Sequence, residues 1–428
     1  MGLKGATHNI LMNRGGLQFP LNVDAMEDFS MLESSRNINL QNGGRQKRGG
    51  TSHIYGSAVT GAPRLNGIMP YIKLDGTVYL VLASENGDLW NGVTGTIATL
   101  LTITKPYCGV TYANTLYMTN PENRVKTWAG SGAAANLTTI PTSWSTTKGP
   151  AQIITRSIGN SVHLVGIGVP GLENSVYISA ADSADFTDAN VTVLSVETDE
   201  GGGIVGAVEF GQRLVLFSRN HAFIVNDADA TRANWGYVQA QWFGGAASWR
   251  LIVKTPNDLH VMTADGDVYS VLAVQEYGDY KLASLARPSW VHTWIKDNVD
   301  TAAIPTKCHG VYDAELRAVK WFVKRATGSD VDTALVYFLD RPASEAWMLH
   351  DNLSAVSGYS ALSSAWGKVP ALNEWKVMTG STAGWAWYLE SEEAALSDNA
   401  AAYAAGFLTA HLHFGNPRAR KAYKYGHI

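Results

Sequence analysis

The stretch Leu65–Trp90, LNGIMPYIKLDGTVYLVLASENGDLW, decides the fold. Its first apolar run leads into Asp75-Gly76, a second apolar run follows at Val78–Ala83, and Asn86-Gly87-Asp88 then precedes Leu89-Trp90. Asp-Gly and Asn-Gly supply the positive φ angles that tight hairpin turns require. The stretch therefore predicts short antiparallel strands joined by tight turns.

The same pattern of short strand, polar turn and short strand recurs along the chain. Further copies lie at Tyr107–Trp128, Ala151–Ser179, Gly203–Asn226, Ala247–Leu272, Lys307–Leu349 and, more weakly, Trp375–Leu389. They make about seven units at irregular spacing, close to the roughly 40–50 residues usual for a propeller blade. Such a unit cannot bury its apolar faces alone, and radial stacking buries them. We predict an all-β protein, a β-propeller of about six to seven irregular blades with N- and C-terminal β extensions. A β-sandwich is the alternative, because it also has short strands at regular intervals.

Two segments stand outside the repeats. We therefore predict the propeller over residues 63–390, an N-terminal extension over residues 1–62 and a C-terminal helix and β segment over residues 391–428. Within the last segment, Glu392–Ala405 predicts a short helix, because early acidic residues suit a helix N-terminus and alanine favours helix. The alternating residues Leu408–Phe414 predict a strand.

Composition and charge exclude several classes of protein. The net charge is -4 and 16% of the residues are charged, which does not fit a protein that holds nucleic acid by neutralising phosphates. The two cysteines, Cys108 and Cys308, give neither a disulfide framework nor metal-binding spacing. Met1–Arg14 has no apolar core of signal-peptide length, and no apolar run approaches the ~20 residues that span a bilayer. We expect a soluble protein without stable membrane insertion.

No motif predicts catalysis or a cofactor. The sequence lacks a Gly-x-Ser-x-Gly elbow and a phosphate loop. Ser84–Trp90 loosely resembles the Asp-box turn of sialidases, but it is one residue short and we find no repeat of it in other blades. His411 and His413 share one face of the predicted strand but have no third ligand nearby. We expect no enzymatic activity, no cofactor and no metal site.

Aromatic and basic residues have structural interpretations. Trp90, Trp128 and Trp347 lie at the ends of predicted strands, which favours packing between blades over sugar stacking. Two basic stretches are short, so a solvated loop or a contact with another subunit or an adaptor is preferred to DNA binding. The residues that we assign to such contacts are Arg45, Lys47, Arg48, Arg418, Arg420 and Lys421.

Three segments, taken in order, suggest a family. Ser35–Leu40 followed by Gly43–Gly50 gives an Asn-centred strand, a glycine turn and a basic run. Asp199–Val225 gives an acidic-glycine turn that enters a blade, and Phe414–Lys421 gives a basic exit from the repeats. Together they resemble the tail nozzle proteins of short-tailed bacteriophages, also called tail stabilisation or tail tubular B proteins. Gly49 stands where that family usually has proline.

The resemblance implies a structural virion protein of the phage tail, assembled in the host cytoplasm. Such proteins form a homo-oligomeric ring, a hexamer, below an adaptor ring on the portal side. The ring holds packaged DNA, conducts it non-specifically during ejection at the host cell envelope, and anchors tail fibres. The alternatives are a glycan-binding or glycan-cleaving propeller and a tail or baseplate ring protein of a longer-tailed phage.

Overall fold

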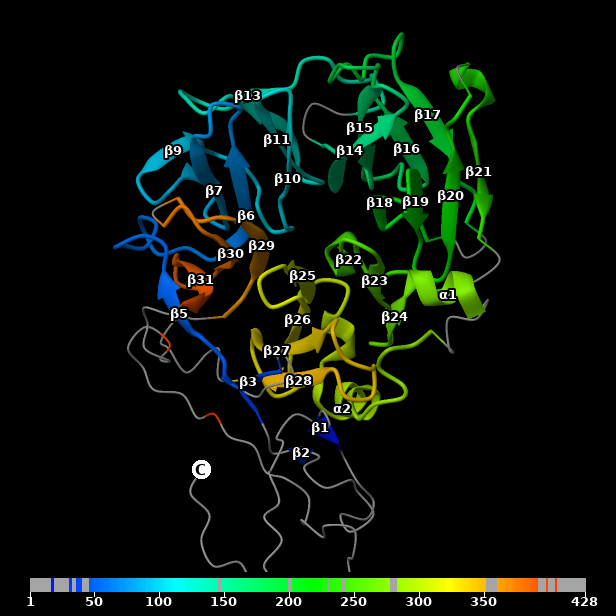
Figure 1. Cartoon of the computed structure of the whole chain (residues 1–428). Coiled ribbons are helices and arrows are strands. Elements are labelled where there is room, and N and C mark those ends of the chain that lie inside the picture. The colour runs from blue at the N-terminus through cyan, green and yellow to red at the C-terminus, as the bar shows by residue number, and fades with distance from the viewer. Residues whose placement is uncertain are drawn as a thin grey trace, which may run out of the picture.

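Seven small antiparallel sheets are arranged around a common axis in the computed structural model (Figure 1). The structure describes residues 17–18, 31–32, 36–40, 46–144, 148–198, 202–229, 231–240, 244–277, 283–351, 360–370, 372–391, 398 and 405. The innermost strand of each sheet contacts the innermost strand of the next sheet, and that of the last contacts that of the first. The prediction of an all-β propeller is therefore confirmed, and the number of blades is seven.

The first four blades each contain four strands in chain order. Blade 1 comprises β6 (Leu65–Ile72), β7 (Val78–Ser84), β8 (Asp88–Asn91) and β9 (Gly95–Ala98). Blade 2 comprises β10 (Cys108–Tyr112), β11 (Thr115–Asn120), β12 (Asn123–Trp128) and β13 (Ala135–Asn136). Blade 3 comprises β14 (Gln152–Ile158), β15 (Ser161–Ile167), β16 (Ser175–Ile178) and β17 (Thr192–Ser195). Blade 4 comprises β18 (Gly206–Phe210), β19 (Arg213–Phe217), β20 (Ala222–Asn226) and β21 (Gly236–Gln239).

The last three blades depart from this regularity. Blade 5 has three strands, β22 (Ile252–Lys254), β23 (Leu259–Met262) and β24 (Val268–Ser270), and α1 (Val271–Tyr277) and α2 (Val291–Asn298) follow it. Blade 6 comprises β25 (His309–Asp313), β26 (Ala318–Lys324), β27 (Val331–Phe338) and β28 (Trp347–His350). Blade 7 comprises β29 (Ser363–Lys368), β30 (Trp375–Gly380), β31 (Ala386–Ser391) and β5 (Gly50–His53). Outside the blades are β1 (Leu17–Gln18) paired with β2 (Met31–Leu32), and β3 (Ile38–Asn39) paired with β4 (Gln46–Lys47).

The ring is closed by a strand from the N-terminal part of the chain. β5 pairs antiparallel with β31, with His53 opposite Trp387 and Ser52 opposite Tyr388. Figure 1 shows the blue β5 beside the orange β31. The segment that we predicted as an N-terminal extension thus supplies the outer strand of blade 7, and the propeller sheets begin at Gly50.

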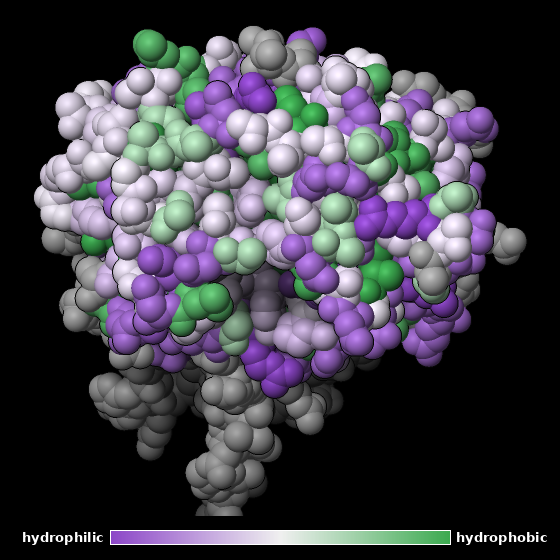
Figure 2. All heavy atoms as spheres, turned by 90° about the horizontal axis from the view of Figure 1, so that it is seen from above, coloured by the Kyte–Doolittle hydropathy of each residue, from purple (hydrophilic) through white to green (hydrophobic). Residues whose placement is uncertain are grey.

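The hydrophobic core lies between the blades. Each of six clusters of buried apolar side chains contains residues from neighbouring blades, and together they run around the whole ring. The largest joins blades 5, 6 and 7 and includes the fully buried Trp321 and Trp347. Trp90 and Trp128 are also buried, as expected for packing residues. Seen from above, the rim mixes hydrophilic and hydrophobic residues without one dominant apolar face (Figure 2).

One turn recurs between the second and third strands of blades 1, 5 and 7. A hydroxyl residue begins the turn and bonds across it, as Ser84 Oγ does to the Asp88 carbonyl oxygen at 2.9 Å. A glycine with positive φ follows three residues after the hydroxyl residue, as at Gly87 with φ 97°. Our expectation that the Ser84 turn has no repeat is therefore wrong. Its copies are Ser84–Trp90, Thr263–Tyr269 and Ser381–Trp387.

Candidate functional site

The N-terminal segment crosses the outside of blade 6 before it enters blade 7. The Asn37 backbone N–H donates to the Leu349 carbonyl at 2.8 Å, and β3 contacts β28. The buried Asn37 side chain donates to Asp351 at 2.9 Å and accepts from the Arg48 Nε at 3.1 Å. The Asn-centred strand and the basic run of the sequence pattern therefore fold against each other.

Arg48 forms a two-pronged ion pair with Asp398. Its Nη1 donates to Oδ1 at 2.9 Å and its Nη2 to Oδ2 at 2.5 Å. The backbone N–H and the hydroxyl of Thr51 donate to the same carboxylate at 3.1 and 3.2 Å. Both charged side chains are almost fully buried, at 3% and 2% exposure. We call Asn37, Arg48, Thr51, Asp351 and Asp398 the terminal clasp, because it ties the N-terminal segment to a residue beyond the last blade.

A second buried charge cluster adjoins the terminal clasp. Lys320 Nζ lies 2.9 Å from both Glu390 Oε1 and Asp313 Oδ2. Burial opposes ionisation of Glu390, but the Lys320 ammonium and other nearby positive charge lower its pKa to about 2. Burial alone would likewise lower the pKa of Lys320, and the two carboxylates raise it instead. Lys320 and Glu390 therefore stay charged, and the three side chains together pin blade 6 to blade 7.

Gly49 occupies a position where the structure does not accommodate a proline. Its backbone N–H donates to Glu390 Oε2 at 2.7 Å, and a Cβ at this position would lie 2.6 Å from the Glu390 Cα. A proline has no N–H to donate and carries a Cβ. The proline that the nozzle family usually has here would therefore break this contact unless Glu390 moved.

The predicted contact residues fall in two groups. Arg48 is buried in the terminal clasp, so its charge is used within the chain and not on a solvated loop. Lys47 lies in β4 and is half-buried. The remaining four, Arg45, Arg418, Arg420 and Lys421, lie outside the described residues, as do the predicted helix and strand after residue 391 and the histidine pair His411 and His413. A subunit or adaptor contact for these residues stays a prediction.

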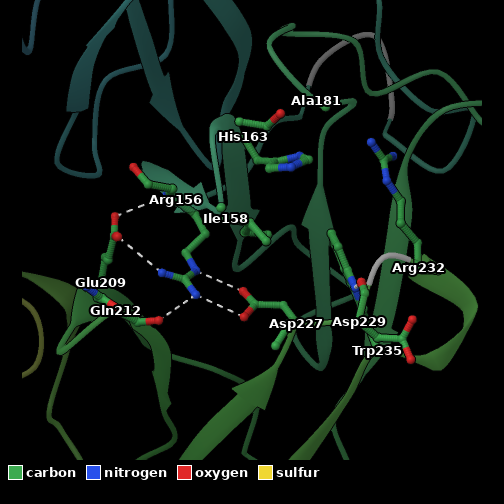
Figure 3. A pocket seen from close by; sticks show the side chains of 14 residues that line it. Arg156, Ile158, His163, Ala181, Glu209, Gln212, Asp227, Asp229, Arg232 and Trp235 are labelled. Atoms are coloured by element: carbon green, nitrogen blue, oxygen red, sulfur yellow. Dashed lines mark hydrogen bonds and ion pairs between the residues drawn. The ribbon is translucent and has the colours of Figure 1, made fainter.

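A cavity with a volume of about 820 Å³ lies between blades 3 and 4. Arg156 of β14 occupies its wall and is 3% exposed. Its guanidinium pairs with Asp227 at 2.8 and 2.9 Å and with Glu209 at 3.1 Å, and donates to the Gln212 carbonyl at 2.8 Å (Figure 3). Burial alone would lower the pKa of Arg156, but the two carboxylates raise it. Arg156 therefore acts as a clamp between two blades.

Other polar groups in the wall of that cavity also form hydrogen bonds within the protein. The ring of Trp235 donates to the Asp229 carbonyl at 2.7 Å and lies against Arg232. The Asp229 carboxylate accepts from Thr231 and Asn234. The polar groups that line the cavity thus hold its own walls together.

The described part of the chain contains no group of three or more His, Cys, Asp and Glu side chains that could hold a metal ion. Cys108 and Cys308 are free thiols, and burial raises the pKa of each to about 11. Among the described residues, no helix is both long and apolar enough to cross a membrane.

The sequence pattern missed Asp398, Glu390 and Lys320. The residues beside these charged side chains in the sequence form no motif that marks them, and their partners lie up to 350 residues away. One signal was present: Lys320 interrupts the apolar run Val319–Val323 at a position that proves to be buried.

Comparison with known proteins gives similarity of fold. No family model matches the sequence, and no curated protein matches it. Among solved structures, BamB from Moraxella catarrhalis is 13% identical, with a TM-score of 0.44 over 84% of this chain and 98% of that one. The Pan2 WD40 domain from Neurospora crassa is 10% identical, with a TM-score of 0.42 over 81% of this chain and 95% of that one. At such identities and TM-scores, neither likeness carries an argument about function.

Proposed function

We propose that this chain is a non-enzymatic subunit of the distal ring of a short-tailed bacteriophage tail, which retains packaged DNA and conducts it during ejection. The observation that carries the proposal is the ordered set of segments that resemble the nozzle family, Ser35–Leu40, Gly43–Gly50, Asp199–Val225 and Phe414–Lys421. In the sequence these segments stand before, within and after the repeats.

The way the blades are joined supports a mechanical role. The Arg156 clamp and the Lys320 cluster bridge adjacent blades, and the terminal clasp holds both ends of the ring. A conduit wall must keep its shape while DNA passes. Buried ion pairs with several hydrogen bonds serve that need, because loss of one partner leaves a costly unpaired charge.

Exposed apolar residues on outer strands are available for a contact between subunits. A closed ring requires a heterologous interface that rotates onto itself. Val193 of β17 and Val238 of β21 are exposed at 44% and 60% on the outer strands of blades 3 and 4. We expect such outer strands to lie near the seams of the ring.

The charge of the chain suits passive conduction. With a net charge of -4, a ring of identical subunits repels DNA overall more than it binds it. We expect a neutral to acidic lumen with Lys and Arg at the subunit seams. A map of charge on an assembled ring tests this expectation, and a continuous basic lumen would contradict it.

Electron microscopy of the purified full-length chain tests the proposal. We expect six-fold rings, formed by the chain alone or on addition of a purified portal–adaptor complex. A chain that stays monomeric and fails to bind that complex would overturn the ring assignment. Incubation with bacterial polysaccharide separates the enzymatic alternative, since release of sugar would contradict a purely structural role.

A further inference from the structure

Blade 4 carries an apolar row on the face that it turns toward blade 5. Val208, Val215, Ile224 and Val238 are paired in register across its four strands. From the second strand outward the exposure of these side chains rises, because Val215 is 5% exposed, Ile224 is half-buried and Val238 is 60% exposed. The outer half of the row is therefore left partly open to solvent.

The opposite face of the same strands is covered. Phe223 and Val225 flank Ile224 on β20, and they are 1% and 2% exposed in a cluster that they share with blade 3. Blade 3 has four strands, whereas blade 5 has three and continues as α1 where a fourth strand would follow. Successive side chains of a strand point to opposite faces. The shorter blade 5 thus accounts for the opening on one face only.

A cavity of about 400 Å³ lies over this open row. Phe210, Arg213, Val215 and Ile224 of blade 4 line it together with Gln275 of α1. Phe210 and Arg213 are paired across β18 and β19, so both side chains lie beside the apolar row on the same face. Among the described lining residues Arg213 alone is charged, and it is exposed and forms no ion pair with the described part of the chain.

We call this cavity, together with the adjoining Val238, the blade 4 groove. It offers an apolar floor and, at one edge, a guanidinium without a counter-ion. A small polar molecule would leave the floor uncovered, and a basic segment would be repelled by Arg213. The partner that fits is a chain segment with apolar side chains next to a carboxylate, because it makes the apolar contact and an Arg–carboxylate pair together.

The N-terminal part of this chain contains such a segment. Residues 19–30, FPLNVDAMEDFS, include three acidic residues and no Lys, Arg or His. Phe19, Leu21 and Val23 alternate with other residues, so they share one face of an extended segment, and Asp24 follows directly. This segment lies outside the described residues. Its sequence complements the blade 4 groove in both apolar character and charge.

The positions of segment and groove suit a contact between two copies of the chain. The segment precedes β3, which lies against the outside of blade 6, whereas the groove belongs to blade 4. A contact between unlike patches of neighbouring copies is heterologous, and heterologous contacts are those that generate a ring. The segment and the groove are such a pair of unlike patches.

We propose that residues 19–30 of one copy dock in the blade 4 groove of the next copy, with Leu21 and Val23 on the apolar row and Asp24 paired with Arg213. The inference rests on the proposed ring and names the contact at its seam. Burial of Ile224 and Val238 supplies most of the affinity. The exposed Arg213 pair contributes less and fixes the orientation.

Disulfide trapping between two singly substituted full-length chains tests the contact. One chain carries Val238→Cys, and the other, made larger by a fused tag, carries Leu21→Cys. Both native cysteines are buried and do not compete. Under mild oxidation we expect the mixed disulfide in a yield about fivefold or more above that of a Leu74→Cys control, the ratio that about 1 kcal/mol of docking free energy gives. Leu74 in blade 1 is 89% exposed, so this control measures chance collision.

Charge reversal adds a test of the ion pair. Arg213→Glu in the Val238→Cys chain should lower the yield about three- to tenfold, because a carboxylate would then meet Asp24. Asp24→Lys in the partner chain should restore the yield. The matched control is Arg219→Glu, which changes an exposed arginine beyond the other end of β19 and should leave the yield unchanged. Melting curves of each variant verify that it is folded.

Three results would overturn the proposal. The first is a mixed disulfide no more abundant with Val238→Cys than with Leu74→Cys. The second is a yield that Arg213→Glu lowers no more than Arg219→Glu does. The third is an internal disulfide in a chain with both Val238→Cys and Leu21→Cys, formed in a yield independent of dilution, since the segment would then occupy the groove of its own copy.

The proposed ring and the proposed seam can fail separately. Six-fold rings in electron micrographs without the mixed disulfide would refute this seam and leave the ring assignment standing. A mixed disulfide that Arg213→Glu lowers and Asp24→Lys restores, in a sample without rings, would support the docking contact and count against the ring.

Discussion

Replacement of Arg48 by methionine tests whether the terminal clasp stabilises the propeller. Methionine retains much of the length of the side chain but removes the guanidinium. Of the donors among the described residues, the Asp398 carboxylate, 2% exposed, then keeps only the two of Thr51. Removal of one partner from a buried ion pair costs about 3–5 kcal/mol, because an uncompensated charge remains. We expect a loss of that size out of a total stability of roughly 5–15 kcal/mol.

The assay is equilibrium unfolding in guanidinium chloride, followed by tryptophan fluorescence. The matched control is Arg317→Met, since Arg317 pairs with Asp340 at 2.9 Å while 63% and 38% exposed. An exposed pair contributes about 0–1 kcal/mol, so the control should shift the midpoint little. Hydrogen exchange locates the effect, and the amides of β5 and β31 should lose protection first.

A double variant sharpens the test. Arg48→Met combined with Asp398→Leu removes both charges and should recover part of the loss, because an apolar pair can replace a buried ion pair at little cost. If Arg48→Met shifts the unfolding midpoint no more than Arg317→Met does, the clasp does not stabilise the ring and the reasoning is refuted.

Three further predictions concern other features. Acid should destabilise the protein below pH 6.5. Burial lowers the pKa of His350 from 6.5 to about 3, so between these two pH values only the unfolded chain takes up a proton at this residue. His350→Gln should therefore reduce the slope of unfolding free energy against pH by about 1.4 kcal/mol per pH unit. Arg156→Met should cost about 3–5 kcal/mol in urea unfolding, because Asp227 would stay buried without its partner. Gly266→Ala should lower the melting temperature, because φ is +83° and the new Cβ would lie 2.4 Å from Ile295 Cγ2.

Each of these has its own control. A stability curve that is flat between pH 6.5 and 4 would contradict the role given to His350. For Arg156, the Arg317→Met variant sets the scale of an exposed pair, and equal losses would contradict the clamp. Gly76→Ala has nearly the same φ of +84° with open space around the Cβ, so it measures backbone strain alone, about 1–3 kcal/mol. Gly266→Ala should cost more than that.

Local patterns predicted most of the blades. Alternating strands around Asp75-Gly76 and Asp265-Gly266 fold as hairpins because the turn chemistry and the strand faces act over a few residues. The two helices escaped prediction. In the sequence, Val271 continues the apolar run of β24, but in the structure it begins α1. The helix begins there because the Ser270 hydroxyl accepts a hydrogen bond from the Ala273 N–H. The Asp258 carboxylate, twelve residues before Ser270, accepts one from the Leu272 N–H.

Non-local contacts account for what the sequence did not reveal. β5 has the sequence GTSH, without an alternating apolar face, and its pairing with β31 depends on the whole ring. Arg48 is one of several basic residues in its run, and only the position of Asp398 distinguishes it as buried.

The strand that closes the ring also sets an order of events during synthesis. β5 leaves the ribosome before any other blade strand, yet roughly 330 residues follow before its partner β31 begins. At about 5–20 residues per second, the N-terminal strand waits on the order of 20–70 s with its hydrogen-bonding edge unpaired. Blades 1 to 6 can stack as they emerge, but circular closure belongs to the last moments of translation. Premature release of the chain therefore yields an open arc of blades with an unpaired strand edge at each end, the form most exposed to aggregation.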